Sequence, residues 1–247
     1  MIVMTIPARS LYEIKRSYRR ITSDTCFGLV YSRAYLASDD LERVVQEGRR
    51  FRLRDGFQMD DLTDDPVWIK KLGSDEHWEF PAKRFTNGVA LSAAKKFKPV
   101  SFPKPLGIVY EGNAADVAAF ERTAYIITPY IEGTPVNHAF TDLNSAVKKQ
   151  FFWRLGLSLK LYAEEGYFPL DLAPRDIVYQ RTQNKEGLQS DVFTFVDTEH
   201  LLFFSGDEKE KPYAAFQEEQ KAEFRKEYGH FLRKKQLEKT MDIVFGD

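Results

Sequence analysis

The chain lacks the residues on which several common classes of site depend. It has one cysteine, Cys26, so neither an internal disulfide bond nor a cysteine-based zinc cluster can form. The four histidines, at positions 77, 138, 200 and 230, do not have the spacing of metal ligands. The G-x-S-x-G, H-E-x-x-H and P-loop patterns are missing too. The chemistry of this chain therefore has to be sought in other residues.

Charge of one sign and long apolar runs are also missing. The 36 lysines and arginines nearly balance the 37 aspartates and glutamates, so no net field draws the chain to nucleic acid. No apolar run approaches the roughly 18 residues of a membrane-spanning helix, and the apolar stretch at the N-terminus is too short for a signal peptide. We expect a cytoplasmic protein with no nucleic-acid partner and no transmembrane segment.

A basic patch near the N-terminus is formed by Lys15, Arg16, Arg19 and Arg20. Such a patch is most often a solvated face. The alternative is a docking surface for an anionic partner, through which the protein would make a peripheral contact.

The first half of the chain reads mostly as strands. After a lead-in over residues 1–48, which we expect to be irregular apart from a short helix at 39–46, the segment RRFRLRDGFQM alternates between apolar and basic residues. Asp55-Gly56 at its centre predicts a hairpin turn. The run VWIKKL predicts a third strand, and residues 75–97 a helix that Asn87-Gly88 could interrupt. Further strands are expected at 104–110 and 123–131.

The second half reads mostly as helices. Apolar residues recur at helical spacing over residues 142–165, and Gly166 ends that pattern. Short strands are expected at 177–179 and 192–196, followed by one charged helix over 217–240. With 247 residues, 43% of them hydrophobic, the chain can bury a sizeable core. We predict an α+β fold of two lobes, with boundaries at 1–48, 49–131 and 132–247 and a linker near residues 129–134.

Three aspartates carry the strongest chemical signal. Asp171 and Asp176 lie in the segment PLDLAPRDIV, and Asp197 follows about twenty residues later at the end of an apolar strand, FVDTE. Phosphoryl transfer needs a carboxylate near the acceptor hydroxyl and oxygen ligands for Mg²⁺ on the phosphates. A loop and a strand end are suitable mounts for converging carboxylates.

These two segments resemble the catalytic loop and the D-F-G turn of the protein-kinase-like superfamily. The resemblance makes Asp171 the catalytic carboxylate and Asp176 and Asp197 the metal ligands. Three departures stand out: Pro169-Leu170 replace His-Arg, Asp176 replaces Asn, and Thr198-Glu199 replace Phe-Gly. Aspartate in place of asparagine keeps an oxygen ligand, so metal binding is expected to survive.

The nucleotide side of the resemblance rests on two further segments. PVWIKKL is similar to the kinase strand V-A-I-K, which makes Lys70 the residue that contacts the phosphates, although Trp68 stands where alanine is usual. TAYIITPYIEG is similar to the segment between the kinase lobes, where backbone groups of Pro129 and Ile131 would meet adenine. Lys83 is the alternative phosphate-binding lysine; Lys70 is preferred because its strand precedes the helix.

Two expected pieces are poorly represented. The glycine-rich loop is reduced to a single glycine, Gly56, in the expected hairpin. The glutamate that would pair with Lys70 is assigned to Glu79, with Glu76 as the other candidate, and glutamates on helices are commonly just solvated.

The resemblance implies binding of ATP and Mg²⁺ and transfer of the γ-phosphoryl group to a hydroxyl. Only 50 residues follow Asp197, which is similar to the minimal members of the superfamily: RIO-like kinases and lipopolysaccharide-core sugar kinases. The acceptor would be a sugar of that kind or a protein Ser/Thr. The alternative is a pseudokinase, a nucleotide-binding or scaffolding module without catalysis. Retention of three acidic positions favours the enzyme. Clustered like charges repel one another, and a scaffold has no evident need to keep them.

Overall fold

A computed structural model gives the fold of two compact units, described one at a time. The sheet unit comprises residues 6–93 and 103–130, and the helical unit comprises residues 1–5, 94–102 and 131–247. The structure describes residues 18–22, 26–31, 35–36, 51–52, 59–60, 67–72, 79–92, 98–112, 123–169, 171–183, 186–196, 201–203 and 210–246.

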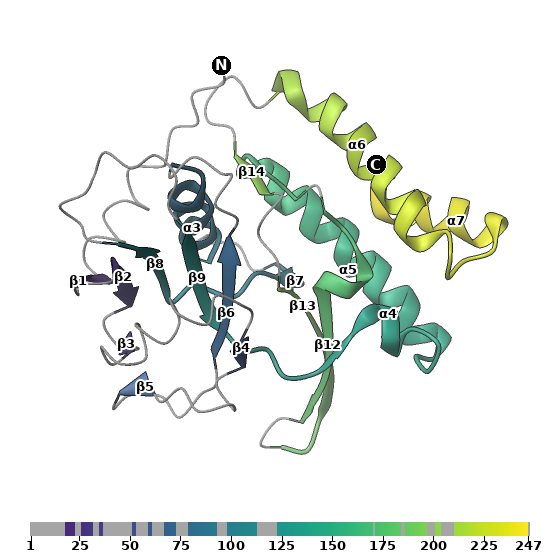
Figure 1. Cartoon of the computed structure of the whole chain (residues 1–247). Helices are drawn as coiled ribbons and strands as arrows, with labels where there is room; N and C mark the ends of the chain where they lie inside the picture. Colours follow the sequence, from purple (N-terminus) through teal and green to yellow (C-terminus); the bar gives the residue numbers. More distant parts are fainter. Residues whose placement is uncertain are drawn as a thin grey trace. The chain divides into compact units, whose positions relative to one another are not determined.

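The sheet unit is built on a six-stranded sheet whose neighbouring strands are all antiparallel. The strands are, in spatial order, β1 (Tyr18–Thr22), β2 (Cys26–Tyr31), β8 (Gly107–Glu111), β9 (Ala124–Pro129), β6 (Val67–Leu72) and β4 (Phe51–Arg52). The helix α3 (Glu79–Ser92) contacts β8 and β9 (Figure 1). A separate pair is formed by β3 (Tyr35–Leu36) and β5 (Met59–Asp60).

Apolar packing between α3 and the sheet forms the core of this unit. Phe85 and Val89 of α3 are buried in one cluster with side chains from four strands, among them Leu72 and Ile108. Gly88 is also buried in α3, and a Cβ there would lie 2.6 Å from Cγ of Pro105. Glycine at 88 therefore lets the helix approach the segment that leads into β8.

Two expectations for this half of the chain are wrong, and one that was left open is decided. Residues 18–31 were expected to be an irregular lead-in, but β1 and β2 form the end of the main sheet. The two arms of the expected hairpin pair elsewhere, β4 with β6 and β5 with β3. The helix α3 continues through Asn87-Gly88, because tertiary packing outweighs the weak helix propensity of that pair. The expected turn at Asp55-Gly56 and the expected short helix at 39–46 lie outside the described residues.

The helical unit is organised around α5 (Ser145–Glu164), which begins after Asn144, whose Oδ1 accepts a hydrogen bond from the Val147 amide at 2.9 Å. The long hairpin of β12 (Ile177–Gln183) and β13 (Gln189–Phe195) carries β10 (Thr134–Pro135) on one edge and β7 (Val100–Ser101) on the other. The remaining elements are α4 (Val136–Ala139), β11 (Tyr167–Pro169), the 3-10 turn η2 (Pro174–Asp176), β14 (Leu201–Phe203), α6 (Glu210–Tyr228) and α7 (Lys234–Phe245).

Aromatic side chains fill the space between α5 and α6. Phe152 of α5 contacts the rings of Phe224 and Tyr228 edge to face, and those two rings stack at 4.3 Å between centroids. The helix α7 approaches α5 closely at Gly156. A Cβ there would lie only 2.6 Å from the carbonyl oxygen of Val244, so glycine permits this approach. The helix α7 contacts both α5 and α6 (Figure 1).

The C-terminal segment differs from the single helix expected over 217–240. The helix α6 ends at Tyr228, a turn follows at Gly229, and α7 begins at Lys234. Glycine weakens a helix interior, and Gly229 is where the chain turns so that α7 can reach α5. Among the described residues no helix is long and apolar enough to cross a bilayer.

The strand β7 belongs to the helical unit although the sheet unit supplies the chain on both sides of residues 94–102. It pairs in parallel with β13. The Val100 amide donates to Oγ of Ser158 at 2.7 Å, and Tyr162 Oη donates to the Val100 carbonyl at 2.9 Å. Two side chains of α5 thus fix this short strand.

Candidate active site

The loop that carries the first two aspartates runs from β11 to β12 in the helical unit. Oδ1 of Asp171 accepts a hydrogen bond from the Ala173 amide at 3.0 Å, which is the local turn that aspartate favours. The amide of Asp176 donates to the Ala173 carbonyl at 2.9 Å, closing η2. The second carboxylate oxygen of Asp171, Oδ2, is not used in this turn and remains for other partners.

The loop joins the end of β13 through one backbone bond. Ile177 is paired with Phe195, and the amide of Val196 donates to the carbonyl of Asp176 at 2.9 Å. Asp197 is the next residue in the sequence and lies outside the described residues. Asp176 therefore lies at the base of the β12–β13 hairpin, opposite Val196, which directly precedes Asp197.

A single arginine connects the carboxylates of this loop. Arg175 Nε lies 3.4 Å from Oδ2 of Asp176, and its Nη2 lies 4.0 Å from Oδ2 of Asp171. Its Nη1 lies 3.5 Å from Oε2 of Glu227, on α6. The Arg175 side chain is 59% exposed, whereas the side chains of Asp171, Asp176 and Glu227 are 22%, 19% and 15% exposed. The acidic groups are thus more shielded from water than the cation that pairs with them.

Tyr228 follows Glu227 in α6. Its ring is fully buried, and its hydroxyl has no hydrogen-bond partner among the described residues. Burial, and then the negative charges of Glu227, Asp171 and Asp176, raise the pKa of Tyr228 well above its ordinary value. The hydroxyl therefore stays protonated and remains a hydrogen-bond donor.

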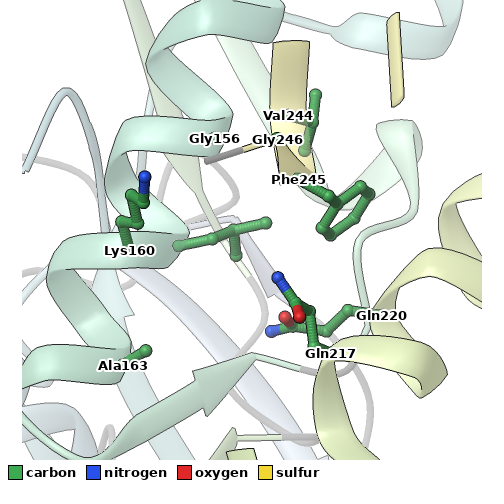
Figure 2. Close-up of a pocket in the computed structure, with 9 residues that line it drawn as sticks. Gly156, Lys160, Ala163, Gln217, Gln220, Val244, Phe245 and Gly246 are labelled. Atoms are coloured by element: carbon green, nitrogen blue, oxygen red, sulfur yellow. The ribbon is translucent and has the colours of Figure 1, made fainter. Parts of the chain in front are cut away.

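The helix α6 is also fixed to the start of the loop. Nε2 of Gln220 donates to the Pro169 carbonyl at 2.7 Å in a buried hydrogen bond. Figure 2 shows the amides of Gln217 and Gln220 side by side in a cavity of about 90 Å³ between α5, α6 and the end of α7. Together with the ion pair of Glu227, this bond fixes α6 at both ends of the segment from Pro169 to Arg175.

The residues expected on the nucleotide side fall in different units. Lys70 lies half-buried in β6, opposite Ile126 of β9. Pro129 ends β9 opposite Val67, while Ile131 is the first residue of the helical unit after the sheet. Trp68, on the same face of β6 as Lys70, stacks on Tyr130 with 6.3 Å between ring centroids.

Several expected residues cannot be placed as side chains. Glu79 is the first residue of α3 and Lys83 lies within that helix, but the structure describes only their backbone. Gly56, Glu76 and Asp197 lie outside the described residues. Of the basic patch, Arg20 is exposed in β1, Arg19 is described only as part of that strand, and Lys15 and Arg16 lie outside the described residues.

Sequence reasoning missed the residues that surround the loop. Arg175 is visible between the two aspartates, but nothing in the sequence indicates that it reaches Glu227, which lies far along the chain. Gln220 and Tyr228 lie in the segment that was expected to be one charged helix, and no residue of that segment was singled out. Such partners become apparent only once α6 is packed on the loop.

Comparison with solved structures finds a protein of similar fold. The chain is similar to the structure "WaaP in complex with acyl carrier protein", with a TM-score of 0.51 and 13% sequence identity. The match covers 85% of this chain and 83% of that one. The likeness shows a kinase-like fold. It agrees with the mixed helices and strands of an α+β protein. No protein-family model and no curated protein sequence matches the chain.

Proposed function

We propose that the protein is an ATP-dependent phosphotransferase with a two-lobe, kinase-like arrangement, the sheet unit binding the nucleotide and the helical unit supplying the carboxylates. The supporting observation is that Asp171 and Asp176 lie on one hydrogen-bonded loop at the base of the β12–β13 hairpin, and that β13 ends at Phe195, two residues before Asp197. The kinase-like fold shared with WaaP agrees with this proposal.

In this proposal Asp171 is the catalytic carboxylate. Oδ1 is held by the Ala173 amide, so Oδ2 is the oxygen that receives the proton of the acceptor hydroxyl. As that proton leaves, the acceptor oxygen bonds to the γ-phosphorus and the bond from this phosphorus to the bridging oxygen of ADP breaks. The products are the phosphorylated acceptor and ADP.

The metal site follows from the donor chemistry. Carboxylate oxygens are the hard ligands that Mg²⁺ prefers, and Asp176 together with Asp197 would hold it. Among the described residues no three His, Cys, Asp or Glu side chains converge into a metal site, so the site requires Asp197. When bound, Mg²⁺ would neutralise negative charge on the phosphates during transfer.

On the nucleotide side, Lys70 would contact the α- and β-phosphates, with Glu79 as its partner and Gly56 in the loop above. Backbone groups of Pro129 and Ile131 would meet the adenine. These assignments rest on the register of β6 and β9 in the sheet unit and on the resemblance of their sequences to kinase strands.

The acceptor is a hydroxyl group, and the kinase-like neighbour suggests where to begin. The sequence motifs resemble those of lipopolysaccharide-core sugar kinases, so a core sugar is the first acceptor to assay, followed by protein Ser/Thr. Acyl carrier protein, which accompanies WaaP in its structure, is a defined partner to include in the same assays. We propose a cytoplasmic site of action, with the N-terminal basic patch as a peripheral contact.

A thermal-shift experiment tests the nucleotide and metal sites together. Mg²⁺ should increase the shift in Tm that ATP gives to the parent protein, because ligands that bind the folded state stabilise it. Asp197→Ala should abolish that increase. The shift in Tm that ATP gives in the absence of Mg²⁺ should stay unchanged. A variant that binds Mg²⁺–ATP as well as the parent would show that Asp197 is not a ligand.

The lysine assignment has its own matched pair. Lys70→Met should weaken ATP binding, because it removes a positive charge from the phosphates, whereas Lys83→Met should do so much less. The reverse ranking would exclude β6 as the phosphate-binding strand.

A nucleotide-binding scaffold without catalysis is the second candidate. It is favoured by Arg175, whose guanidinium lies within ion-pair distance of both loop aspartates and so occupies their oxygens. The two candidates differ in turnover: the enzyme transfers labelled phosphate from ATP to one member of an acceptor panel, and the scaffold binds ATP without transferring it.

A further inference from the structure

A cavity of about 330 Å³ lies in the helical unit, bounded by α4, the turn before α5, and the strands β10 and β12. No described residue of the segment from Pro169 to Asp176 lines it, so it is separate from the loop that carries the two aspartates. Pockets that bind small molecules usually measure about 300–1,000 Å³. This cavity is at the lower end of that range, which suits a ligand of one ring.

Polar side chains of the cavity wall have hydrogen-bonding atoms to spare. Nε of Arg181 lies 3.2 Å from Oδ1 of Asp191, and among the described residues its Nη1 and Nη2 have no partner. Oδ1 of Asn144 caps α5, which leaves its amide nitrogen as a donor. The exposed imidazole of His138 forms no hydrogen bond with the described part of the chain. Hydrogen-bonding groups from three separate segments therefore line one cavity.

The charges around the cavity offset one another. Arg181 is already paired with Asp191, and Asp142 adds an exposed carboxylate to the wall. An anionic ligand would meet the charge of Asp142, and a cationic ligand would meet that of Arg181. Because like charges repel, neither kind of ligand is favoured. The wall instead offers donors and an acceptor to a ligand without net charge.

The cavity also has an apolar side. The ring centroid of Tyr179 lies 5.3 Å from that of Phe193, and its hydroxyl donates to Oδ1 of Asp191 at 2.7 Å. These two contacts hold the tyrosine ring in place. The buried side chains of Ala139 and Leu143 add further apolar surface. A ligand of this cavity therefore needs C–H groups as well as hydroxyls, which both donate and accept hydrogen bonds.

We propose that this cavity binds a neutral sugar ring. The pyranose hydroxyls accept hydrogen bonds from Arg181 and Asn144 and donate one to Asp142, while C–H groups of the ring lie against Tyr179. A sugar fits because it has no net charge and carries its hydroxyls around an apolar ring. The inference does not depend on the proposed function, since the loop aspartates take no part in this binding.

NMR of the histidine side chains tests the proposal directly. The chain has four histidines, and the imidazole resonance of His138 is assigned as the one missing from His138→Ala. Titration with the neutral pyranoses D-glucose, D-galactose and D-mannose should shift that resonance, and the shift should saturate. The resonance of His230, an exposed histidine outside the cavity, should not move. No shift with any of the three sugars, or equal shifts at both histidines, would overturn the proposal.

Substitutions of Asp142 test the hydrogen-bond acceptor. Asp142→Ala should weaken sugar binding, followed through the His138 resonance, by about threefold to tenfold, as expected for one lost hydrogen bond. Asp142→Asn keeps an acceptor oxygen and should lose less. Asp242→Ala, which removes an exposed aspartate of α7 outside the cavity, is the matched control and should bind as the parent does. Parent-like binding and Tm in Asp142→Ala would overturn the assignment of the sugar to this cavity.

Charged relatives of glucose test the class of ligand. Glucose 6-phosphate and glucosamine add a negative or a positive charge to the same ring, and both should bind more weakly than glucose. Tighter binding of either one would overturn the neutral class. Asp171→Asn should bind the sugar as the parent does. Sugar binding by a protein that transfers no phosphate would overturn the proposed function alone, whereas phosphate transfer without sugar binding at His138 would overturn this inference alone.

Discussion

Among the described residues, the core of the sheet unit around α3 is mostly apolar, whereas in the helical unit polar side chains also hold two short segments through bonds to backbone groups. In the sheet, Ile69 and Ile127 are completely buried and pair across β6 and β9. In the helical unit, Ser158 and Tyr162 bond to both polar groups of Val100, and Gln220 bonds to Pro169. The difference indicates that a packing change in the sheet is spread over many neighbours, while a polar change near the loop acts on one segment.

The largest effect should separate chemistry from stability in the helical unit. Asp171→Asn should lower phosphoryl transfer by about 10²–10⁴-fold, the usual contribution of a general base. Its folding should be almost unaffected, because asparagine can still accept the hydrogen bond of the Ala173 amide through its carbonyl oxygen. Initial rates with labelled ATP and a parallel ATP-binding measurement check this. Equal turnover in parent and variant would show that the loop is misassigned.

The next effect tests packing in the sheet unit. Ile69→Ala should lower the free energy of unfolding by about 2–5 kcal/mol, because it leaves a cavity in a fully buried strand. Ile69→Val, which removes one methylene, should cost only about 0.5–1.5 kcal/mol. Urea unfolding followed by fluorescence measures both. Equal costs for the two variants would mean that the sheet does not behave as a packed core.

Loss of a single buried polar bond should cost less than truncation of a whole core side chain, but far more than loss of a surface hydroxyl. Ser158→Ala leaves the buried Val100 amide without its acceptor, which should cost about 1–3 kcal/mol. Ser145→Ala, at the exposed start of the same helix, is the control and should change stability little. If both serines gave the same small loss, the contrast between the two units would not hold for β7.

Much of the architecture could be predicted where burial leaves a direct pattern in the sequence. VWIKKL, the apolar runs of β8 and β9, the helical periodicity of α5 and the strands β12 and β13 all formed where expected. Apolar spacing reports which face of an element is buried, and these elements are buried on a continuous face. The same signal is weak in YRRIT, whose two arginines hid the strand β1.

The surroundings of the loop could not be predicted for a different reason. Glu227 and Arg175 are 52 positions apart in the sequence, and their contact depends on how α6 packs, not on any local pattern. The break at Gly229 was missed because charged residues continue on both sides of it. The roles of Asp171 and Asp176 rest on motif resemblance, and the structure adds the hydrogen bonds that hold their loop.

An unpaired polar group offers a test with the opposite sign. Tyr228→Phe removes a buried hydroxyl that has no partner among the described residues, so it should raise the free energy of unfolding by about 1 kcal/mol. Tyr162→Phe removes a paired hydroxyl and should lower stability by a similar amount. Loss of stability in both variants would show that Tyr228 does have a partner, such as an ordered water.

The smallest effect is expected at the exposed part of the long hairpin. Arg181 Nε lies 3.2 Å from Oδ1 of Asp191, and the side chain is about half exposed, so Arg181→Gln should lower Tm only slightly. That loss should shrink in high salt, because ions screen exposed pairs. A larger loss of stability that does not depend on salt would show that this ion pair contributes as much to the helical unit as its buried polar bonds do.

The path of residues 94–102 has a consequence for how the protein can be divided. The chain leaves the sheet unit after Ala93, contributes β7 to the helical unit, and returns at Pro103 before leaving again after Tyr130. No single cut therefore separates the units. A fragment that starts at Ile131 would leave the β7 edge of β13 open and Ser158 without the amide that it binds. The two units therefore cannot be exchanged between proteins as separate stretches of sequence. A recombination that replaces the helical unit must also replace residues 94–102, which interrupt the sequence of the sheet unit.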